Sequence, residues 1–408
     1  MADTLHKSGR PKVDPDWKQS NVTYLDLGEL GLRLKTVDKL ILEIAAKRIE
    51  LAQRVEEFKR LNKEKIYREQ TETSRLSDAQ RWAVELGLNP EFARALLYLY
   101  IGESCKAQMI QLQDMSKHLP SFPDEASATE WYKEQLLELT RLCAESYDER
   151  YSETFFATKL YLDFESQVIA EVVKDHLERK RVALDLGCAT GRQSFLLSRF
   201  FHSVVGYDIS PDMIRVTKRK KEEKGLKSNL VFEIADIEEG IPYEDGKADL
   251  VVMGMGFASD IHKIGFVLSE IERVLTHKGL AVLSFYNRSA LIYSWQFIPW
   301  PISLTASINL QRHCLDVHWK EETGQDSKKK ISSKIFSVYA KPYTINEVES
   351  ILPSHLPVIC QYTFPTIASI LPDVLLSDPA VLKSVFELDR QLANQENGAY
   401  TLVVIKKP

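Results

Sequence analysis

The most constraining stretch of this sequence is residues 182–208, where a short apolar run, a glycine-containing loop, a helical segment and a second apolar run follow one another. Residues 182–186 have the composition of a buried parallel strand, and residues 192–200 have the periodicity of a helix packed on it. The second apolar run starts at Ser203 and closes on Asp208. Glycines let a backbone approach a ligand closely, and a helix start offers free N–H groups to an anion. The terminal carboxylate can accept hydrogen bonds from two ribose hydroxyls, so the stretch predicts a nucleoside site.

Two alternatives to a nucleoside site have to be considered, and the spacing of the loop argues against one of them. Gly187, Gly191 and an acid 17 residues beyond Gly191 agree with a nucleoside site. A dinucleotide-binding loop needs its third glycine at position 192, where Arg192 stands. The remaining alternative is a glycine turn in an ordinary α/β domain, without a ligand.

The loop resembles the first motif of the class I S-adenosylmethionine-dependent methyltransferases, and it reads Asp185-Leu186-Gly187-Cys188-Ala189-Thr190-Gly191. The family usually has glycine where Ala189 stands. The resemblance covers about residues 145–408 and implies S-adenosyl-L-methionine as the cofactor. The residues that it implies for cofactor binding are Asp185, Gly187, Cys188, Ala189, Gly191, Asp208, Ile209, Asp236 and Ile237.

The same resemblance implies a role for several of these side chains. Asp208 would bind the ribose and Ile209 would lie beside the adenine. Asp236, at the end of the third expected strand, would meet the adenine amino group. Asp185 and Gly187 would face the methionine end of the cofactor.

Size and composition describe an ordinary globular protein. A chain of 408 residues is too long for one typical core and predicts two domains. A net charge of −5 gives no sign of the basic surface that binds nucleic acid or an anionic membrane. No signal segment follows Met1 and no apolar run is long enough for a bilayer, so we expect a cytoplasmic protein. A reducing compartment also suits the scattered cysteines, which are Cys105, Cys143, Cys188, Cys314 and Cys360.

Beyond Asp208 the pattern alternates between strands and helices. This alternation predicts an α/β, doubly wound, Rossmann-like sheet. We expect strands at 230–235, 248–254, 280–285, 357–362 and 399–405, and helices at 211–224, 266–275 and 344–352. Residues 276–279 resemble the family's turn before the fifth strand.

Residues 287–340 interrupt the alternation with many aromatic side chains. We expect this segment to be a lid over a hydrophobic acceptor or an inserted subdomain. Core packing explains Trp295, Trp300 and their neighbours equally well. The stretch His313–His318 holds metal-ligand residue types but no fourth ligand at a recognised spacing, so no metal is predicted.

Asp260 and His262 follow the fourth strand, where the family places acceptor-facing residues. Methyl transfer from a sulfonium needs alignment and exclusion of water. A hydroxyl or an acidic carbon as acceptor also needs a general base. We therefore take Asp260 and His262 as candidates for methyl transfer, although many relatives carry histidine at position 260. A helix-capping aspartate is the alternative for Asp260.

The first part of the chain is helical. Apolar residues at three- and four-residue steps between Leu34 and Phe58 predict one long amphipathic helix at about 30–65. Its length favours packing against a second copy of the chain, which predicts a homodimer. Two shorter helices are expected at 69–86 and from Pro90 to about Met115. The predicted division is a tail at 1–24, a helical domain at 25–115, a connector at 116–144 and the α/β domain at 145–408.

One long helix followed by two shorter ones resembles the all-helical chorismate mutases. The matching residues are Asp38, Arg48, Lys59, Glu72, Ser104 and Gln108. The resemblance implies that Arg48 and Lys59 hold the substrate's carboxylate and ether oxygen. A dianion that rearranges through a polarised transition state needs such fixed positive charge.

Two departures from that family bear on its activity. Gly31 and Thr71 stand where the family has arginines, and Lys35 lies one turn after Gly31. Losing two cationic contacts weakens anion and transition-state binding. The helical domain is therefore either a mutase or a degenerate module for dimerisation or ligand sensing. A third reading makes Arg48 and Lys59 two solvated charges on a long helix.

Together these features predict a bifunctional enzyme, a methyltransferase fused to a domain that converts chorismate to prephenate. The fusion suggests a small-molecule acceptor derived from chorismate or prephenate, such as an aromatic or keto acid of secondary metabolism. One alternative is a non-catalytic sensor of S-adenosylmethionine. Another is an enzyme that uses prephenate to modify the sulfonium itself.

Overall fold

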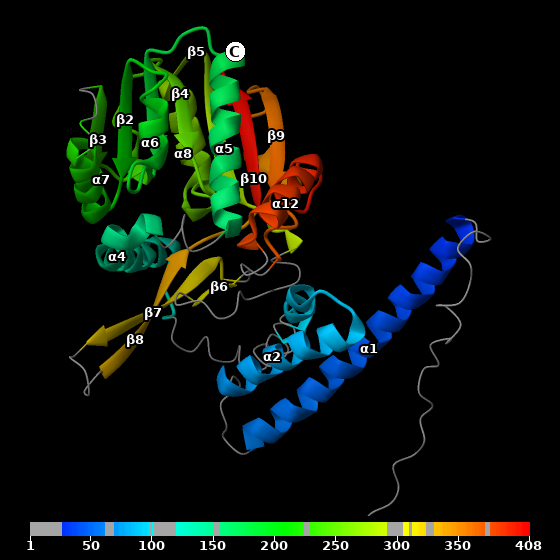
Figure 1. Ribbon diagram of the computed structural model, residues 1–408. Helices are drawn as coiled ribbons and strands as arrows, with labels where there is room; N and C mark the ends of the chain where they lie inside the picture. The colour runs from blue at the N-terminus through cyan, green and yellow to red at the C-terminus, as the bar shows by residue number, and fades with distance from the viewer. Residues whose placement is uncertain are drawn as a thin grey trace, which may run out of the picture. The chain divides into compact units, whose positions relative to one another are not determined.

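The computed structural model describes residues 27–61, 69–97, 99–101, 120–149, 156–223, 225, 229–291, 305–309, 312–323, 330–371 and 376–408. The chain divides into two compact units, Met1–Ile66 and Tyr67–Pro408, and each is described by itself (Figure 1). Within the described residues, no helix is both long and apolar enough to cross a membrane.

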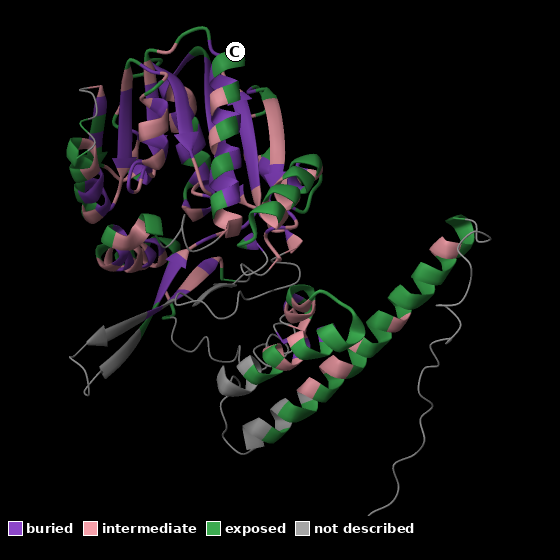
Figure 2. Ribbon diagram, viewed as in Figure 1, coloured by how far each residue is buried: buried purple, intermediate pink, exposed green. Residues whose placement is uncertain are grey.

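The first unit contains the helix α1, Leu27–Leu61, as the apolar periodicity predicted. Pairs four residues apart lie along it, with Arg33 2.8 Å from Glu29 and Arg54 2.6 Å from Glu50. Its surface is largely exposed (Figure 2). The exposed apolar side chains include Leu34, Val37, Ile41, Ile44, Leu51, Val55 and Phe58. A helix with this much exposed apolar surface gains stability by covering it.

Two further helices follow in the second unit. Helix α2, Glu69–Leu86, stops at Gly87, whose φ of +69° glycine adopts without strain. The next helix starts at Pro90 after Asn89, whose side chain accepts a hydrogen bond from the Glu91 N–H at 2.8 Å. The expected end of this helix near Met115 lies outside the described residues.

The main sheet is a seven-stranded, mixed, Rossmann-like sheet in the order β3-β2-β1-β4-β5-β10-β9 (Figure 1). The first five strands of that order are parallel, and β10 runs antiparallel to β5 and β9. The strands are β1 Val182–Leu186, β2 Ser203–Asp208, β3 Leu230–Ile234, β4 Ala248–Met253, β5 Leu275–Tyr286, β9 Val358–Phe364 and β10 Tyr400–Lys406.

Helices cover both faces of this sheet. The first face packs on α5, Phe156–Asp175, and the other on α8, Ile264–Val274. Val252 of β4 faces the first cluster and Val251 the second, because successive strand residues point to opposite faces. Both valines are fully buried, which explains the uninterrupted apolar run at this strand. The other helices of this fold are α6 Arg192–Leu197, α7 Pro211–Glu223, α10 Ile345–Ile351 and α12 Pro379–Leu392.

The turn predicted at 276–279 is wrong, because these residues belong to β5. Ala248 pairs with Leu275 and Leu250 pairs with Leu280, so the intervening residues of β5 bulge while the strand continues. Lys278 takes a φ of +66° within the bulge. A register shift against a neighbouring strand leaves no mark in local sequence, so the pattern mimics a turn.

The aromatic segment after β5 forms a second, antiparallel sheet of three strands, β6 Thr305–Asn309, β7 Cys314–Thr323 and β8 Lys330–Tyr339. Helix α4, Glu125–Cys143, packs against it. Trp319 and Phe336 are buried there with Leu139 of α4 and Met213 of α7. Trp319 is therefore a core residue of the inserted sheet, whereas Tyr293, Trp295 and Trp300 lie outside the described residues.

Candidate functional site

The glycine loop leaves the carboxyl end of β1 in left-handed backbone conformations. Gly187, Ala189 and Gly191 have φ values of +68°, +44° and +88°. A Cβ at Gly187 would lie 2.4 Å from the Phe257 ring, and one at Gly191 would lie 2.7 Å from Thr217 Cγ2. Ala189 is unusual, because a side chain disfavours this backbone region. The family's usual glycine at position 189 would adopt it freely.

Asp208 closes β2 beside this loop. Its Oδ2 accepts a hydrogen bond from the Ala189 N–H at 2.8 Å, and its Oδ1 accepts one from the Ser210 N–H, also at 2.8 Å. Burial raises the pKa of Asp208 to about 6. The Cys188 N–H also donates to the Tyr207 carbonyl at 2.9 Å. The loop and the end of β2 therefore form one rigid edge, and each carboxylate oxygen keeps a lone pair for a ligand.

Asp185 lies beneath the loop rather than at its surface, with 2% of its area exposed. Its Oδ2 accepts a hydrogen bond from Ser194 Oγ of α6 at 2.6 Å. Burial raises the pKa of Asp185 to about 6. The structure thus shows Asp185 joining β1 to the helix after the loop.

Asp236 follows β3 and caps the short helix η6, Ile237–Glu239, by accepting from the Glu238 N–H at 3.0 Å. Its Oδ2 accepts from Lys133 Nζ of α4 at 2.6 Å, and the same amine lies 3.0 Å from Glu238. Ile237 is buried and Ile209 is half-buried. Lys133 was missed from the sequence, because it is 103 residues from Asp236 and belongs to no motif.

Asp260 ends the short helix η7, Ala258–Asp260, beyond β4. Its Oδ2 accepts a hydrogen bond from Tyr286 Oη at 3.4 Å. Burial raises its pKa well above its usual range. Lys263, not Asp260, occupies the N-cap of α8, so the capping alternative is wrong.

His262 turns to a different set of partners from Asp260. Its ring stacks on Tyr339 at 3.5 Å between centroids and lies 5.7 Å from Tyr132 of α4. Burial lowers its pKa, which favours the neutral ring. Within the described part of the chain, its Nε2 has no hydrogen-bond partner. The structure therefore places His262 in an aromatic cluster between α4 and β8, separate from the contact between Asp260 and Tyr286.

Comparison with known families identifies both parts of the chain. Residues 177–330 match the model of a methyltransferase domain, and residues 32–109 match the model of chorismate mutase type II. The chain carries a methyltransferase domain and a chorismate mutase type II domain. Both resemblances drawn from the sequence are confirmed, and the first implies S-adenosylmethionine as the cofactor.

Curated relatives of the methyltransferase domain include a demethylmenaquinone methyltransferase of Leptospira interrogans, 29% identical over 128 residues, which are 29% of this chain and 51% of the relative. A demethylmenaquinone methyltransferase of Thermus thermophilus is 37% identical over 111 residues, 26% of this chain and 47% of the relative. The chain spans about half the length of such relatives. A solved S-adenosylmethionine-dependent methyltransferase from Clostridium acetobutylicum matches 66% of this chain and 98% of its own, with 15% identity and a TM-score of 0.46.

The residues of the methyltransferase domain fit this cofactor. Asp208 has acceptor capacity left for a ribose diol, and the loop beside it excludes side chains at Gly187 and Gly191. Gln193 Oε1, at the start of α6, is buried and has no hydrogen-bond partner within the described residues. A cradle of this kind suits a nucleoside with polar substituents.

The mutase domain is described only in part. Arg48 is half-buried on α1, and Lys59 lies eleven residues further along the same helix. The side chains of Lys59 and Glu72 lie outside the described residues, as do Ser104 and Gln108 entirely. The grouping of these five residues into one site therefore stays a prediction.

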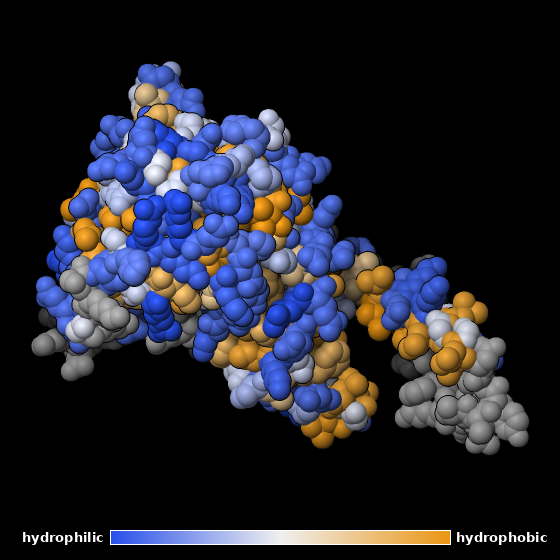
Figure 3. Space-filling view, turned by 90° about the horizontal axis from the view of Figure 1, so that it is seen from above, coloured by the Kyte–Doolittle hydropathy of each residue, from blue (hydrophilic) through white to orange (hydrophobic). Residues whose placement is uncertain are grey.

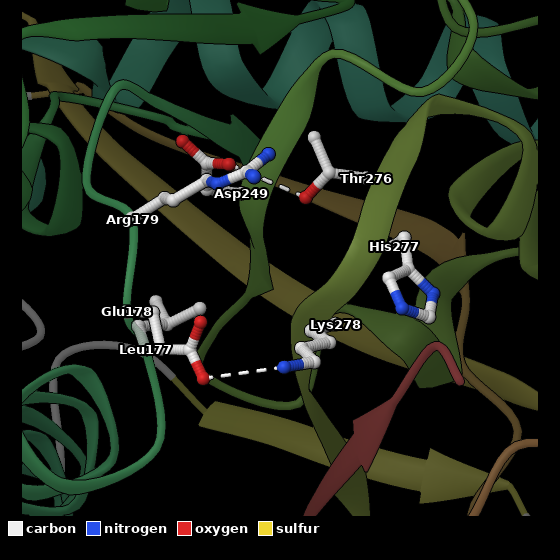
Figure 4. Close-up of a pocket in the computed structure, with 7 residues that line it drawn as sticks. All are labelled: Leu177, Glu178, Arg179, Asp249, Thr276, His277 and Lys278. Carbon is white, nitrogen blue, oxygen red and sulfur yellow. Dashed lines mark hydrogen bonds and ion pairs between the residues drawn. The ribbon is translucent and has the colours of Figure 1, made fainter.

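Arg179, Asp249 and Lys278 are among the residues that line a polar pocket of about 190 Å³ (Figure 4). This pocket lies at the amino ends of β1 and β4, whereas the glycine loop follows the carboxyl end of β1. Asp249 at its wall accepts from the Arg181 N–H at 2.8 Å and from Thr276 Oγ1 at 3.2 Å. Lys278 lies 3.3 Å from Glu178. Figure 3 views the molecule from above the orientation of Figure 1, and the surface of the α/β domain that it shows is mainly hydrophilic. Ligands of open α/β sheets bind at the carboxyl ends of the strands, so this amino-end pocket is not the candidate site.

Proposed function

We propose that the methyltransferase domain transfers a methyl group from S-adenosylmethionine to a small-molecule acceptor. The observation that carries this proposal is the contact between Asp208 and the Ala189 N–H, which fixes an acid beside a glycine loop. Asp208 would hold the ribose, Ile209 and Ile237 the adenine, and Asp236 the adenine amino group. When bound, the cofactor supplies an activated methyl group, so the protein has to align the acceptor and exclude water.

Asp260 is the proposed general base for this transfer. Burial raises the pKa of its carboxyl, and a higher affinity for protons suits a base that removes a proton from a hydroxyl or an acidic carbon. Tyr286 donates to one oxygen and stabilises the ionised form, while the other oxygen is left to accept the acceptor's proton. His262 lies in the aromatic cluster with Tyr339 and Tyr132, and we give it no part in the proton transfer.

A second candidate function, conversion of chorismate to prephenate, is favoured by the match of residues 32–109 to chorismate mutase type II. Arg48, Lys59, Glu72, Ser104 and Gln108 would form that site. We propose that the acceptor of the methyl group is an acid derived from chorismate or prephenate. The relatives named for demethylmenaquinone support a small-molecule acceptor in general.

We also propose that the protein is a homodimer joined through α1. The exposed apolar side chains of α1 support this proposal, since removing apolar surface from contact with water is favourable.

The test combines both functions in one incubation. The purified protein receives methyl-labelled S-adenosylmethionine and chorismate, and mass spectrometry follows every product. Labelled product together with S-adenosylhomocysteine supports the transferase, and prephenate supports the mutase. Saturable cofactor binding with no release of S-adenosylhomocysteine from any acceptor would instead support the non-catalytic sensor. Loss of chorismate without accumulation of prephenate, or a modified sulfonium, would instead support an enzyme that uses prephenate to modify S-adenosylmethionine itself.

A further inference from the structure

A fully buried carboxylate lies between the two loops of the candidate site. Glu165 of α5 has 0% of its area exposed. Its Oε2 accepts hydrogen bonds from Arg192 Nη2 and Gln193 Nε2, both at 2.5 Å, and these residues begin α6 directly after the glycine loop. Its Oε1 accepts from the Met255 N–H at 2.7 Å, in the loop after β4. One side chain therefore contacts both loops.

A relay of hydroxyl groups extends this contact to β5. Tyr161 Oη donates to Glu165 Oε1 at 3.0 Å and also contacts Ser284 Oγ. Because the tyrosine has a single proton and Glu165 takes it, Ser284 is the donor in the second contact. Ser284 Oγ in turn accepts from the Gly256 N–H at 2.7 Å. Two successive N–H groups of the loop after β4 are thus held by Glu165 and by the relay that ends on it.

The loop that is held in this way has a disfavoured backbone. Met255 and Gly256 have φ values of +55° and +78°. A residue with a side chain persists in this region only when its surroundings hold it there. The same loop continues to Phe257, whose ring lies against Gly187, and then to Asp260. Its conformation therefore sets the position of the proposed base relative to the glycine loop.

We propose that Glu165 is a positioning residue for methyl transfer, an inference that rests on the proposed function. It fixes the start of α6 and the loop after β4 relative to each other, so the cofactor and the general base keep a fixed relative position. In-line transfer depends on this position, since a displacement of about 1 Å can reduce a rate about a hundredfold.

Only a carboxylate at position 165 can accept all the hydrogen bonds that its neighbours donate. All four partners of Glu165 are donors, two at each oxygen. In a glutamine, one of the two oxygens is replaced by an NH₂ group, which is a donor. The two buried donors that face that atom would then lose their acceptor. Arg192 would keep two other acceptors, Leu162 O at 3.1 Å and Ser166 Oγ at 2.9 Å. The substitution Glu165→Gln thus disturbs the join between the loops while leaving the arginine partly held.

Three variants of the full chain test the proposal: Glu165→Gln, Ser284→Ala and the control Glu171→Gln, an exposed glutamate of the same helix. Calorimetry measures the Kd for S-adenosylmethionine. A product assay measures the rate of S-adenosylhomocysteine release at saturating cofactor and 25 °C, with the acceptor found in the product screen. Thermal melting followed by circular dichroism reports stability.

We expect Glu165→Gln to lower the saturated rate at least about tenfold and to raise the Kd several-fold, because it touches both loops. Ser284→Ala should lower the rate with an unchanged Kd, because the Ser284 hydroxyl accepts directly from the Gly256 N–H of the loop after β4 and is linked to the start of α6 through Tyr161 and Glu165. Glu171→Gln should match the wild type in both.

A Glu165→Gln protein that melts lower but turns over at the wild-type rate overturns the inference, since its role is then structural only. If Glu165→Gln does not fold, Ser284→Ala decides, and a wild-type rate in that variant overturns the relay. A wild-type protein that binds cofactor but methylates nothing overturns the proposed function, and the positioning role falls with it.

Discussion

The Ala189 N–H donates a hydrogen bond of 2.8 Å to Asp208 Oδ2, so the loop after β1 and the acid after β2 are one structural unit. The acid therefore has two tasks, shaping the loop and accepting hydrogen bonds from a bound ribose. This double task makes Asp208 the most informative position for mutation.

Asp208→Ala should weaken binding of S-adenosylmethionine by roughly tenfold to a hundredfold, because hydrogen bonds to a charged acceptor are lost and the Ala189 N–H loses its partner. Isothermal titration calorimetry measures the change in Kd. Asp163→Ala, an exposed aspartate of α5, is the matched control and should bind as the wild type does. Equal affinity in both variants would contradict the assigned site.

Gly187→Ala should also impair cofactor binding, because the new Cβ meets the Phe257 ring at 2.4 Å and the backbone φ is +68°. Gly265→Ala is its control, since nothing lies within 4 Å of a Cβ at that position of α8. The control should be neutral or slightly stabilising, by about 0.5–1 kcal/mol in a helix. The measurements are the Kd and the thermal midpoint, and equal effects of the two variants would count against the loop geometry.

Cofactor affinity should fall in acid. Asp208 accepts hydrogen bonds best when ionised, and its pKa in the free protein is about 6. The Kd should be constant above about pH 7 and rise about tenfold per pH unit below pH 6, as for uptake of one proton. Titrations between pH 5 and 8 check this slope, and a flat profile would mean that Asp208 does not bind the ligand.

The same raised pKa values affect the stability of the free protein. Asp185 and Asp208 hold their protons up to about pH 6 in the folded state, whereas an unfolded aspartate loses its proton near pH 3.9. The unfolded chain therefore binds fewer protons in this window. The free energy of unfolding contributed by these two groups falls as the pH rises from about 4 to about 6 and is constant above it.

Asp260→Asn should reduce the rate of methyl transfer by about 10²- to 10⁴-fold with little change in the Kd for the cofactor, as expected for loss of a general base. Tyr286→Phe removes the hydrogen bond that favours ionised Asp260, so the acid limb of its pH–rate profile should move to higher pH. The readout is release of S-adenosylhomocysteine as a function of pH. A normal rate in Asp260→Asn would exclude this residue as the base.

Ile41→Asp should convert a dimer into a monomer, because a charge would enter the apolar face of α1 that we propose is covered by a second copy. Lys47→Glu changes an exposed polar position of the same helix and should leave the dimer intact. Light scattering after size-exclusion chromatography measures the mass. A wild-type monomer, or a dimer in both variants, would reject this interface.

Local sequence was sufficient for the elements that carry local signals. The apolar run before Gly187 and the acid at Asp208 predict β1, its loop and the end of β2, because strand burial and glycine geometry depend on neighbours in the chain. The resemblance then supplied Asp236 and Asp260. The long helix α1 followed equally directly from its apolar periodicity.

Long-range contacts could not be predicted in this way. Lys133 meets Asp236 across 103 residues, and Glu165 meets the Met255 N–H across 90 residues. Neither pair has a motif, because each depends on how α4 or α5 packs against the completed sheet. The bulge of β5 was missed for a related reason, since the register of Leu275 is set by its pairing with Ala248.

The most direct test of the central claim is a crystal structure of the protein with S-adenosylhomocysteine bound. We predict that both ribose hydroxyls lie within hydrogen-bond distance of Asp208, with the adenine between Ile209 and Ile237. A nucleoside bound elsewhere, or no nucleoside beside the glycine loop at saturating ligand, would contradict the account.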